Sequence, residues 1–248
     1  MLHDHALQCV HDPLLILLSY LVSALGSFTA LQLAIAIPAA RTPRERWRAV
    51  AGAGAAMGGG AIWAMHFIAM LACRMDVQVS YDLGITALSA VIAIASCMTG
   101  LAVAGAGVFG WGKLIVAGLC MGLGVTGMHY TGMAAMLMPA QTHYDMTLVG
   151  ASAAIAVVAS IVALWLAFHL RGKWQMTGSA LVMALAVCGM HYTGMQAATF
   201  VPDANATAGN GLSGANLGMG IFAVTTVLLA VVLSTSLLRQ RQRELVQI

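Results

Sequence analysis

Seven long apolar segments, separated by short polar ones, make up most of the 248-residue chain. They cover residues 14–37, 49–72, 83–106, 114–138, 146–170, 177–200 and 217–238. None contains Asp, Glu, Lys or Arg, and each is long enough to cross a hydrocarbon core of about 30 Å as a helix. Their hydrophobic residues are continuous rather than alternating, which favours helices over a β-barrel. The pattern predicts an all-α, seven-transmembrane helix bundle.

The composition agrees with a protein that is surrounded by membrane lipid. Hydrophobic residues make up 60% of the chain and charged residues only 8%, whereas a soluble domain carries about 25% charged residues. This balance excludes a soluble enzyme and a disordered chain. The net charge of +3 is too small to indicate a nucleic-acid partner.

Basic residues gather on one side of the predicted membrane, which sets the orientation. Ten of the eleven Lys and Arg residues fall on that side, and only Arg74 falls on the other. Because basic loops stay in the cytoplasm, residues 1–13 are predicted to form an outer tail, residues 14–238 the membrane domain and residues 239–248 a cytoplasmic basic tail. We expect a multi-pass membrane protein. Cys9 and Cys73 both fall on the outer side, where an oxidising environment allows a disulfide.

An internal repeat organises the chain. Three similar motifs contain His66, His129 and His191, which are 63 and 62 residues apart, and this period equals one helix pair with its loops. The second and third copies both read Gly-Met-His-Tyr-Thr-Gly-Met. The chain is therefore predicted to consist of three two-helix repeats plus a seventh helix. Four residues that directly precede the odd-numbered helices are predicted N-caps: Asp12, Asp82, Asp145 and Asn216.

The three histidines are predicted to lie at a similar depth, because the helices that carry them all run in the same direction. Each lies about 10–15 Å below the outer end of its helix at 1.5 Å per residue. If these helices pack around a common axis, the histidines converge in the outer half of the membrane. Ionisable residues inside a membrane are costly and usually functional.

The motif residues indicate a metal site. Each His shares a helix face with the Met four residues later, and another Met directly precedes it. Thioether and imidazole groups suit copper rather than Mg or Ca, while haem held by axial His or Met is the alternative. Tyr130 and Tyr192 are candidates to orient a ligand bound there. The nine candidate metal ligands are Met65, His66, Met70, Met128, His129, Met133, Met190, His191 and Met195.

Several functional interpretations fit these residues. No candidate set of catalytic groups is visible, so an enzyme is not expected. A copper sensor, a copper transporter or handling protein, and a haem- or copper-based electron carrier would each use a His and Met site. In a further interpretation the histidines form a structural polar network within an assembly factor for a membrane metalloenzyme.

Over about residues 10–240 the sequence resembles the MHYT family of bacterial membrane sensor domains, because two of its motifs contain Met-His-Tyr-Thr in full. The resemblance implies a protein of the bacterial inner membrane, with copper bound by the motif Met and His residues and sensing of oxygen, carbon monoxide or nitric oxide. The first copy departs from the pattern at Phe67 and Ile68, so it lacks the tyrosine hydroxyl. Such domains are often joined to cyclic-di-GMP enzymes or histidine kinases. Because the chain continues for only ten residues after the seventh predicted helix, we expect a cytoplasmic signalling partner in trans.

Overall fold

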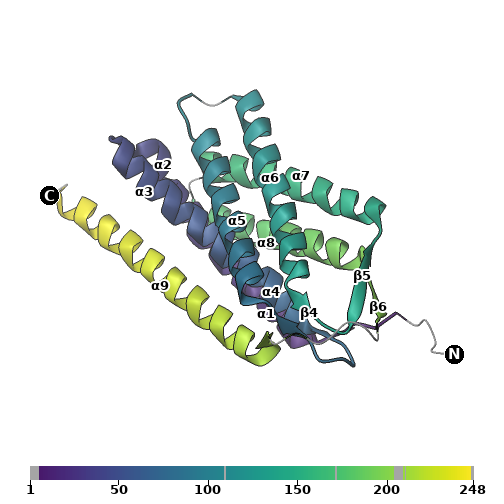
Figure 1. Ribbon diagram of the computed structural model, residues 1–248. Helices are drawn as coiled ribbons and strands as arrows, with labels where there is room; N and C mark the ends of the chain where they lie inside the picture. The colour runs from purple at the N-terminus through teal and green to yellow at the C-terminus, as the bar shows by residue number, and fades with distance from the viewer. Residues whose placement is uncertain (1–5, 109, 171, 204–208, 210, 247–248) are drawn as a thin grey trace.

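The computed structural model describes residues 6–108, 110–170, 172–203, 209 and 211–246. Long helices dominate it (Figure 1). The helical elements are α1 (Pro13–Ala34), α2 (Ala36–Ala39), α3 (Pro43–Gly54), the π-helix η1 (Ala55–Trp63), α4 (Ala64–Ala72), α5 (Leu83–Ala104), α6 (Trp111–Ala134), α7 (Met146–His169), α8 (Lys173–Gln196) and α9 (Gly214–Val246).

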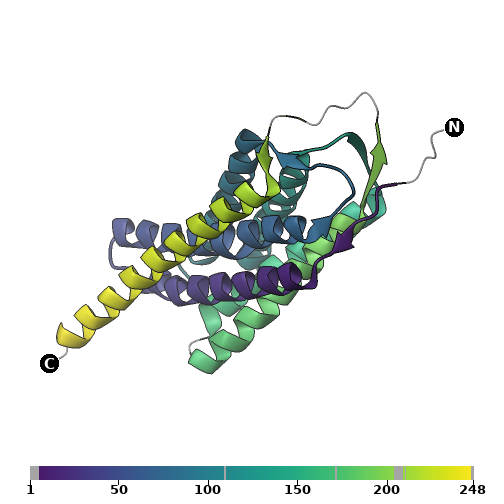
Figure 2. The same cartoon turned by 90° about the horizontal axis from the view of Figure 1, so that it is seen from below.

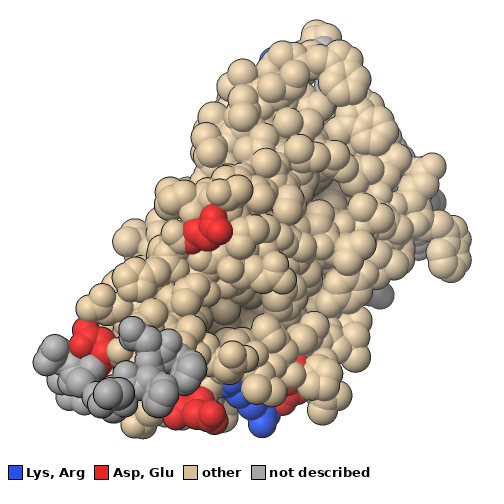
Figure 3. Space-filling view, turned by 90° about the vertical axis from the view of Figure 1, so that its right-hand side faces the viewer, with Lys and Arg blue, Asp and Glu red and all other residues tan. Residues whose placement is uncertain are grey.

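Six helices are long and apolar enough to cross a membrane, and they correspond to the first six predicted segments. The seventh segment is also helical and forms part of α9, although the apolar stretch Gly214–Val227 is shorter than the other six. In the space-filling view, most of the visible surface carries no acidic or basic side chain, as expected of a surface that faces lipid (Figure 3). The predicted helical architecture is confirmed at this level.

The second membrane helix is the centre of the bundle. It runs continuously through α3, η1 and α4, and it is the most buried of the six candidate spans. Helices α1, α5 and α9 pack against it, and α9 crosses the bundle beside α1 (Figure 2). The remaining helices complete the bundle through the consecutive pairs α5–α6, α6–α7 and α7–α8, with α8 packed against α1.

Seven short strands lie at one end of the bundle, which we call the strand end. β1 (Val10–His11) pairs with β2 (Cys73–Arg74), and β5 (Ala140–Tyr144) pairs with β6 (Ala198–Pro202). β3 (Ser80–Tyr81) lies between β4 (Met136–Leu137) and β7 (Leu212–Ser213). All these pairs are antiparallel.

These strands were not predicted, and they correct the ends of two helices. Helix α6 ends at Ala134 and α8 at Gln196, four residues before the predicted ends of these segments at 138 and 200. Met138 and Phe200 are buried at the strand end, outside both helices. An apolar run of residues does not distinguish a helix terminus from a buried strand that continues it, so hydropathy alone extended both helices.

Three of the four predicted helix caps are confirmed. The side chains of Asp12, Asp82 and Asp145 accept hydrogen bonds from backbone N–H groups in the first turns of α1, α5 and α7. The prediction for Asn216 is wrong, because α9 begins at Gly214 and Ser213 Oγ accepts a hydrogen bond from the Asn216 N–H group. Serine caps a helix as well as asparagine does, so residue type alone did not locate this terminus.

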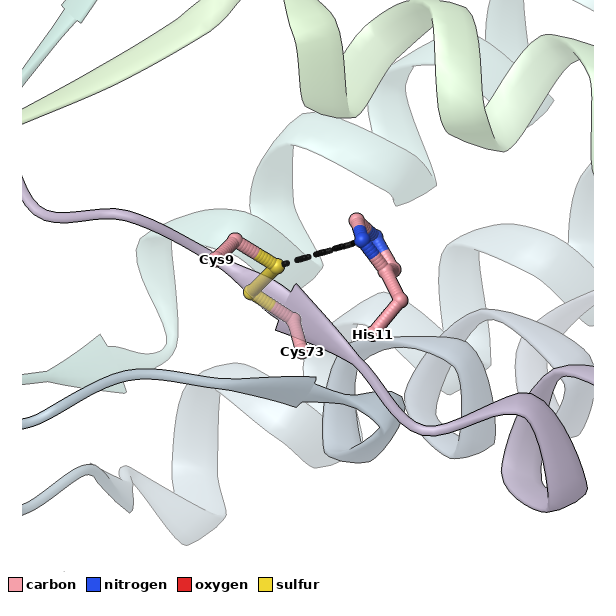
Figure 4. Close-up of a disulfide and its surroundings, with 3 residues drawn as sticks. All are labelled: Cys9, His11 and Cys73. Atoms are coloured by element: carbon pink, nitrogen blue, oxygen red, sulfur yellow. Dashed lines mark hydrogen bonds between the residues drawn. A yellow bond between two sulfur atoms is a disulfide. The ribbon is translucent and has the colours of Figure 1, made fainter.

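A disulfide between Cys9 and Cys73 joins the N-terminal segment to the end of the central helix, with 5.2 Å between their Cα atoms (Figure 4). The sequence allowed this pairing but did not require it. His11 lies beside the bond, with its Nε2 atom 3.6 Å from Cys9 Sγ. Next to it, Arg74 forms an ion pair of 2.5 Å with the capping residue Asp12. The strand end therefore carries a covalent and an ionic connection between α1 and α4.

Candidate metal centre

Three histidines from three different helices meet inside the bundle. His66 comes from α4, His129 from α6 and His191 from α8, and each side chain is 1% exposed. The Nδ1 atom of His66 lies 3.0 Å from Nδ1 of His191 and 3.2 Å from Nδ1 of His129. One ring nitrogen from each residue can be chosen so that all three lie within 4.8 Å of one another. The predicted convergence is therefore present, and we call these residues the His triad.

The spacing of these nitrogen atoms is suitable for a metal ion. Metal–nitrogen bonds of about 2.0–2.1 Å in trigonal or tetrahedral geometry place neighbouring nitrogen atoms about 3.3–3.6 Å apart. The observed separations of 3.0 and 3.2 Å are close to this range. At these separations one neutral imidazole can donate its Nδ1–H to the next, and loss of that proton leaves a lone pair that a metal ion can bind. The donor set, three imidazoles, is one that copper and zinc accept.

The second glycine of each full motif gives room for a histidine of the neighbouring helix. A Cβ atom on Gly132 would overlap Nε2 of His66, and one on Gly194 would overlap Nε2 of His129. The equivalent residue in the first copy is Ala69, which is buried. By contrast, Gly127 has open space where its Cβ atom would be. The two glycines of the motif therefore differ in role, and only the one after the His shapes the site.

The second ring nitrogen of each triad histidine lies against neighbouring helices, as Nε2 of His66 does beside Gly132 and Nε2 of His129 beside Gly194. Within the described residues, the Nε2 atoms of His66, His129 and His191 are buried and have no hydrogen-bond partner. A structural network of buried histidines normally satisfies such atoms. The hydrogen-bonding contacts of the triad are thus made by the Nδ1 atoms, which face one another.

Aromatic rings surround the triad. Phe67, fully buried, meets His66 edge to face with 4.9 Å between ring centroids, and Tyr81 packs against Phe67 on the side of the strand end. Burial raises the pKa of Tyr81 to about 12, so it stays a neutral phenol. Sequence reasoning treated Phe67 only as a departure from the motif. A large aromatic residue directly after a motif His is the sequence feature that could have predicted this contact with the triad.

The two candidate tyrosines contact the triad through their rings. Tyr130 lies edge to face with His129, and Tyr192 with His191, at centroid distances of 4.8 and 5.0 Å. The Tyr130 hydroxyl lies 2.9 Å from Ser152 Oγ on α7. Because Ser152 Oγ donates to the Val149 carbonyl oxygen, the tyrosine is the donor in this bond.

The six candidate methionines are all buried but belong to different layers. Met70, Met133 and Met195 share one hydrophobic cluster with Phe67 and Tyr81, toward the strand end. The methionines that precede the histidines lie elsewhere: Met128 and Met190 in the main core, and Met65 in a small cluster with Ala69 and Cys188. The structure thus brings one methionine from each copy into a common cluster on one side of the triad, and ligation by these methionines stays a prediction.

Comparison with known proteins identifies the family. Residues 59–117, 122–180 and 185–246 each match the MHYT family, described as "Bacterial signalling protein N terminal repeat". The three matches cover more than half of the chain, and the first of them contains His66, the second His129 and the third His191. The chain belongs to the MHYT family and has the architecture of a multi-pass membrane protein.

Curated relatives are signalling proteins. The chain is 40% identical over 237 residues to the bifunctional diguanylate cyclase/cyclic di-GMP phosphodiesterase MucR of Pseudomonas aeruginosa, covering 93% of this chain and 34% of MucR. It is 36% identical over 196 residues to the cyclic di-GMP phosphodiesterase NbdA of the same organism, covering 77% of this chain and 25% of NbdA. The chain therefore spans about a third or less of the length of these relatives. No solved structure matches it.

Proposed function

We propose that this chain is a membrane sensor that holds copper in the His triad and responds to a diatomic gas, oxygen, carbon monoxide or nitric oxide, or to redox state. The observation that carries the proposal is the convergence of three Nδ1 atoms, with contacts of 3.0 and 3.2 Å, from three sequence repeats. Burying three imidazoles away from water is costly, and a cation bound at their Nδ1 atoms would offset that cost. The relatives with cyclic di-GMP enzyme names support a signalling role.

Each part of the site has a role in this proposal. The three histidines hold the metal, Gly132 and Gly194 allow them to approach, and Phe67 with Tyr81 limits the access of water from the strand end. Bound copper would supply one-electron redox chemistry and, with three protein ligands, an open position for a gas. Because α4, α6 and α8 each supply one ligand, a change in metal coordination is transmitted to three helices at once. A sensor requires that the two helix arrangements differ in their affinity for the ligand.

The packing of the triad supports copper over haem. The centroids of the three imidazole rings lie 4.8–5.2 Å apart, in edge-to-face contact. A porphyrin that used two of these histidines as axial ligands would have to separate rings that touch each other. A single metal ion needs no such opening.

The signal would leave through the opposite end of the bundle. There, Arg46 donates a hydrogen bond to the Ala102 carbonyl oxygen, and Lys113 donates to the carbonyl oxygens of Ala106 and Val108. These contacts connect the ends of the helices that lead to and from the triad. We place this basic end in the cytoplasm of a bacterial cell, where a signalling partner would read its conformation.

The experiment is gas binding to the copper(I)-loaded protein in mild detergent. Carbon monoxide bound to copper(I) gives an infrared stretching band, so we expect such a band in the parent protein and its loss in His129→Ala. Gly127→Ala is a matched control within the same motif, because its added Cβ meets no neighbour within 4 Å. Copper that binds but shows no response to carbon monoxide, nitric oxide or oxygen, in either absorption or infrared spectra, would contradict the sensor function.

A further inference from the structure

A second group of methionines lies two helical turns from the His triad, on the side away from the strand end. In the second and third repeats, Met121 and Met183 each stand eight residues before the motif His. In the first repeat that position is Gly58, and Met57 stands nine residues before His66. In an uninterrupted α-helix the additional residue would rotate Met57 by about 100° away from the equivalent face. The first repeat would then have no methionine on the face that Met121 and Met183 occupy in theirs.

The π-helix η1 removes this mismatch. It covers Ala55–Trp63, and most of these residues lie between Met57 and His66. A π-type hydrogen bond spans five residues instead of four, so a π segment takes up an additional residue within the same number of turns. Met57 therefore returns to the face that Met121 and Met183 occupy in their own helices. Such segments are rare and are found often at functional sites.

The three methionines meet at one internal cavity. Met57, Met121 and Met183 line it together with Met190, and these four side chains are between 1 and 6% exposed. The cavity has a volume of about 40 Å³, which exceeds the about 10–15 Å³ that one water molecule needs on this measure. Met190 directly precedes the triad residue His191, so the cavity adjoins the layer of the triad.

The lining is suitable for a soft ion. No carboxylate, imidazole or thiol is among the lining residues, and the polar ones are Ser27 and Ser160. The buried Ser27 hydroxyl has no hydrogen-bond partner among the described residues, which indicates a site that accepts a further group. Thioether sulfur is a soft ligand that selects copper(I) over harder ions, and silver(I) has the same preference.

We propose that this cavity is a second metal site, in which the thioether sulfurs of Met57, Met121 and Met183 bind a soft monovalent cation, copper(I) or silver(I). The proposal concerns a different set of ligands from the triad and does not depend on the function proposed for the triad. In this proposal each repeat supplies one ligand to each site. The three methionines therefore have the same one-per-repeat arrangement as the three histidines, two helical turns away. Met190 lies between the two layers.

The test is silver(I) binding to the full chain in mild detergent, measured as bound silver per protein after removal of free ions. The parent is expected to bind two silver ions, and the Met121→Leu/Met183→Leu variant to lose one of them. Leucine keeps most of the volume of methionine, so the helix packing is retained. Met219→Leu is the control, because this methionine is 65% exposed on α9. Met57→Leu, which leaves α6 and α8 unchanged, is expected to weaken the same ion.

The triad variant His129→Ala separates this proposal from the copper sensor. We expect it to keep one silver ion, with an X-ray absorption spectrum that shows sulfur neighbours only. Two results would overturn the thioether site and leave the triad as the metal site. One is the complete loss of silver from His129→Ala, and the other is unchanged silver binding in both methionine variants. Silver lost only from the methionine variants would support the thioether site and contradict metal binding by the triad.

Discussion

The Nδ1 atoms of His66 and His191 are 3.0 Å apart although 125 positions separate these residues in the sequence. This contact joins the first and third copies of the motif, and His129 of the second copy completes the group at 3.2 Å from His66. Repetition of one two-helix unit therefore builds a site that no single unit contains. The consequence is that each copy is expected to be necessary for metal binding.

The glycine after each motif His gives the first prediction. In Gly132→Ala the new methyl group overlaps the imidazole of His66, so the histidine must leave its position and copper affinity is expected to fall at least tenfold. Gly127→Ala adds the same methyl group to the same helix at an open position and is expected to retain copper. Copper titration of the two variants measures the difference. Equal affinities would show that the position of His66 does not matter for the metal.

The hydroxyl of Tyr130 gives a prediction about stability. Tyr130→Phe removes its hydrogen bond to Ser152 but keeps the ring that contacts His129. Losing one such bond is expected to lower the free energy of unfolding by about 1 kcal/mol. A double-mutant cycle with Ser152→Ala measures the coupling between the two residues. Copper content is expected to stay at the parent value, and a loss of copper from Tyr130→Phe would assign the hydroxyl a direct role at the metal.

The Cys9–Cys73 disulfide is expected to stabilise the strand end. It closes a segment with a sequence separation of 64 residues, and cross-links of this kind contribute about 2–4 kcal/mol. The Cys9→Ser/Cys73→Ser variant is expected to melt at a lower temperature than the parent in detergent. Cys97→Ser, at a buried free cysteine in the core, controls for loss of a thiol. If the two variants melted together at the parent temperature, the disulfide would have no stabilising role.

The orientation of the bundle can be tested with two exposed residues at opposite ends. Met146 begins α7 beside the strand end and is 73% exposed, while Trp174 lies near the start of α8 and is 90% exposed. We expect an impermeant maleimide to label Met146→Cys in cells whose outer membrane is permeabilised, and Trp174→Cys only after lysis. The disulfide at the strand end agrees with this orientation, because disulfides persist outside the cytoplasm. The reverse labelling pattern would place the basic end outside.

Much of the architecture could be predicted from the sequence because the relevant signals are local. Charged residues limit the apolar segments, and Asp12, Asp82 and Asp145 mark three helix starts. The period of the motif histidines predicted a common depth, and their convergence followed once helix packing was assumed. The π-helix could not be predicted, because no residue pattern distinguishes it from the surrounding α-helix. A regular α-helix would place Met57 out of register with Met121, so the sequence alone does not predict the methionine cavity.

The strand end was missed for a different reason. Two-residue strands such as β3 form through backbone pairing with distant segments, which leaves no periodic pattern in the sequence. The packing of Tyr81 against Phe67 depends on that pairing and on the end of α4. The packing around the site therefore required the three-dimensional structure, whereas the candidate ligands could be predicted from their repetition.

The most direct test of the central claim is the copper content of the parent protein and of His66→Ala, His129→Ala and His191→Ala. The four proteins are purified in mild detergent after growth with copper, and their folding is checked by melting temperature. The same series includes the variant Met121→Leu/Met183→Leu. Its copper content shows how much of the parent's copper is held in the methionine cavity rather than by the triad. The shared site predicts copper in the parent and the loss of the same equivalent in each of the three histidine variants. Folded histidine variants that all retain the parent copper content would contradict it.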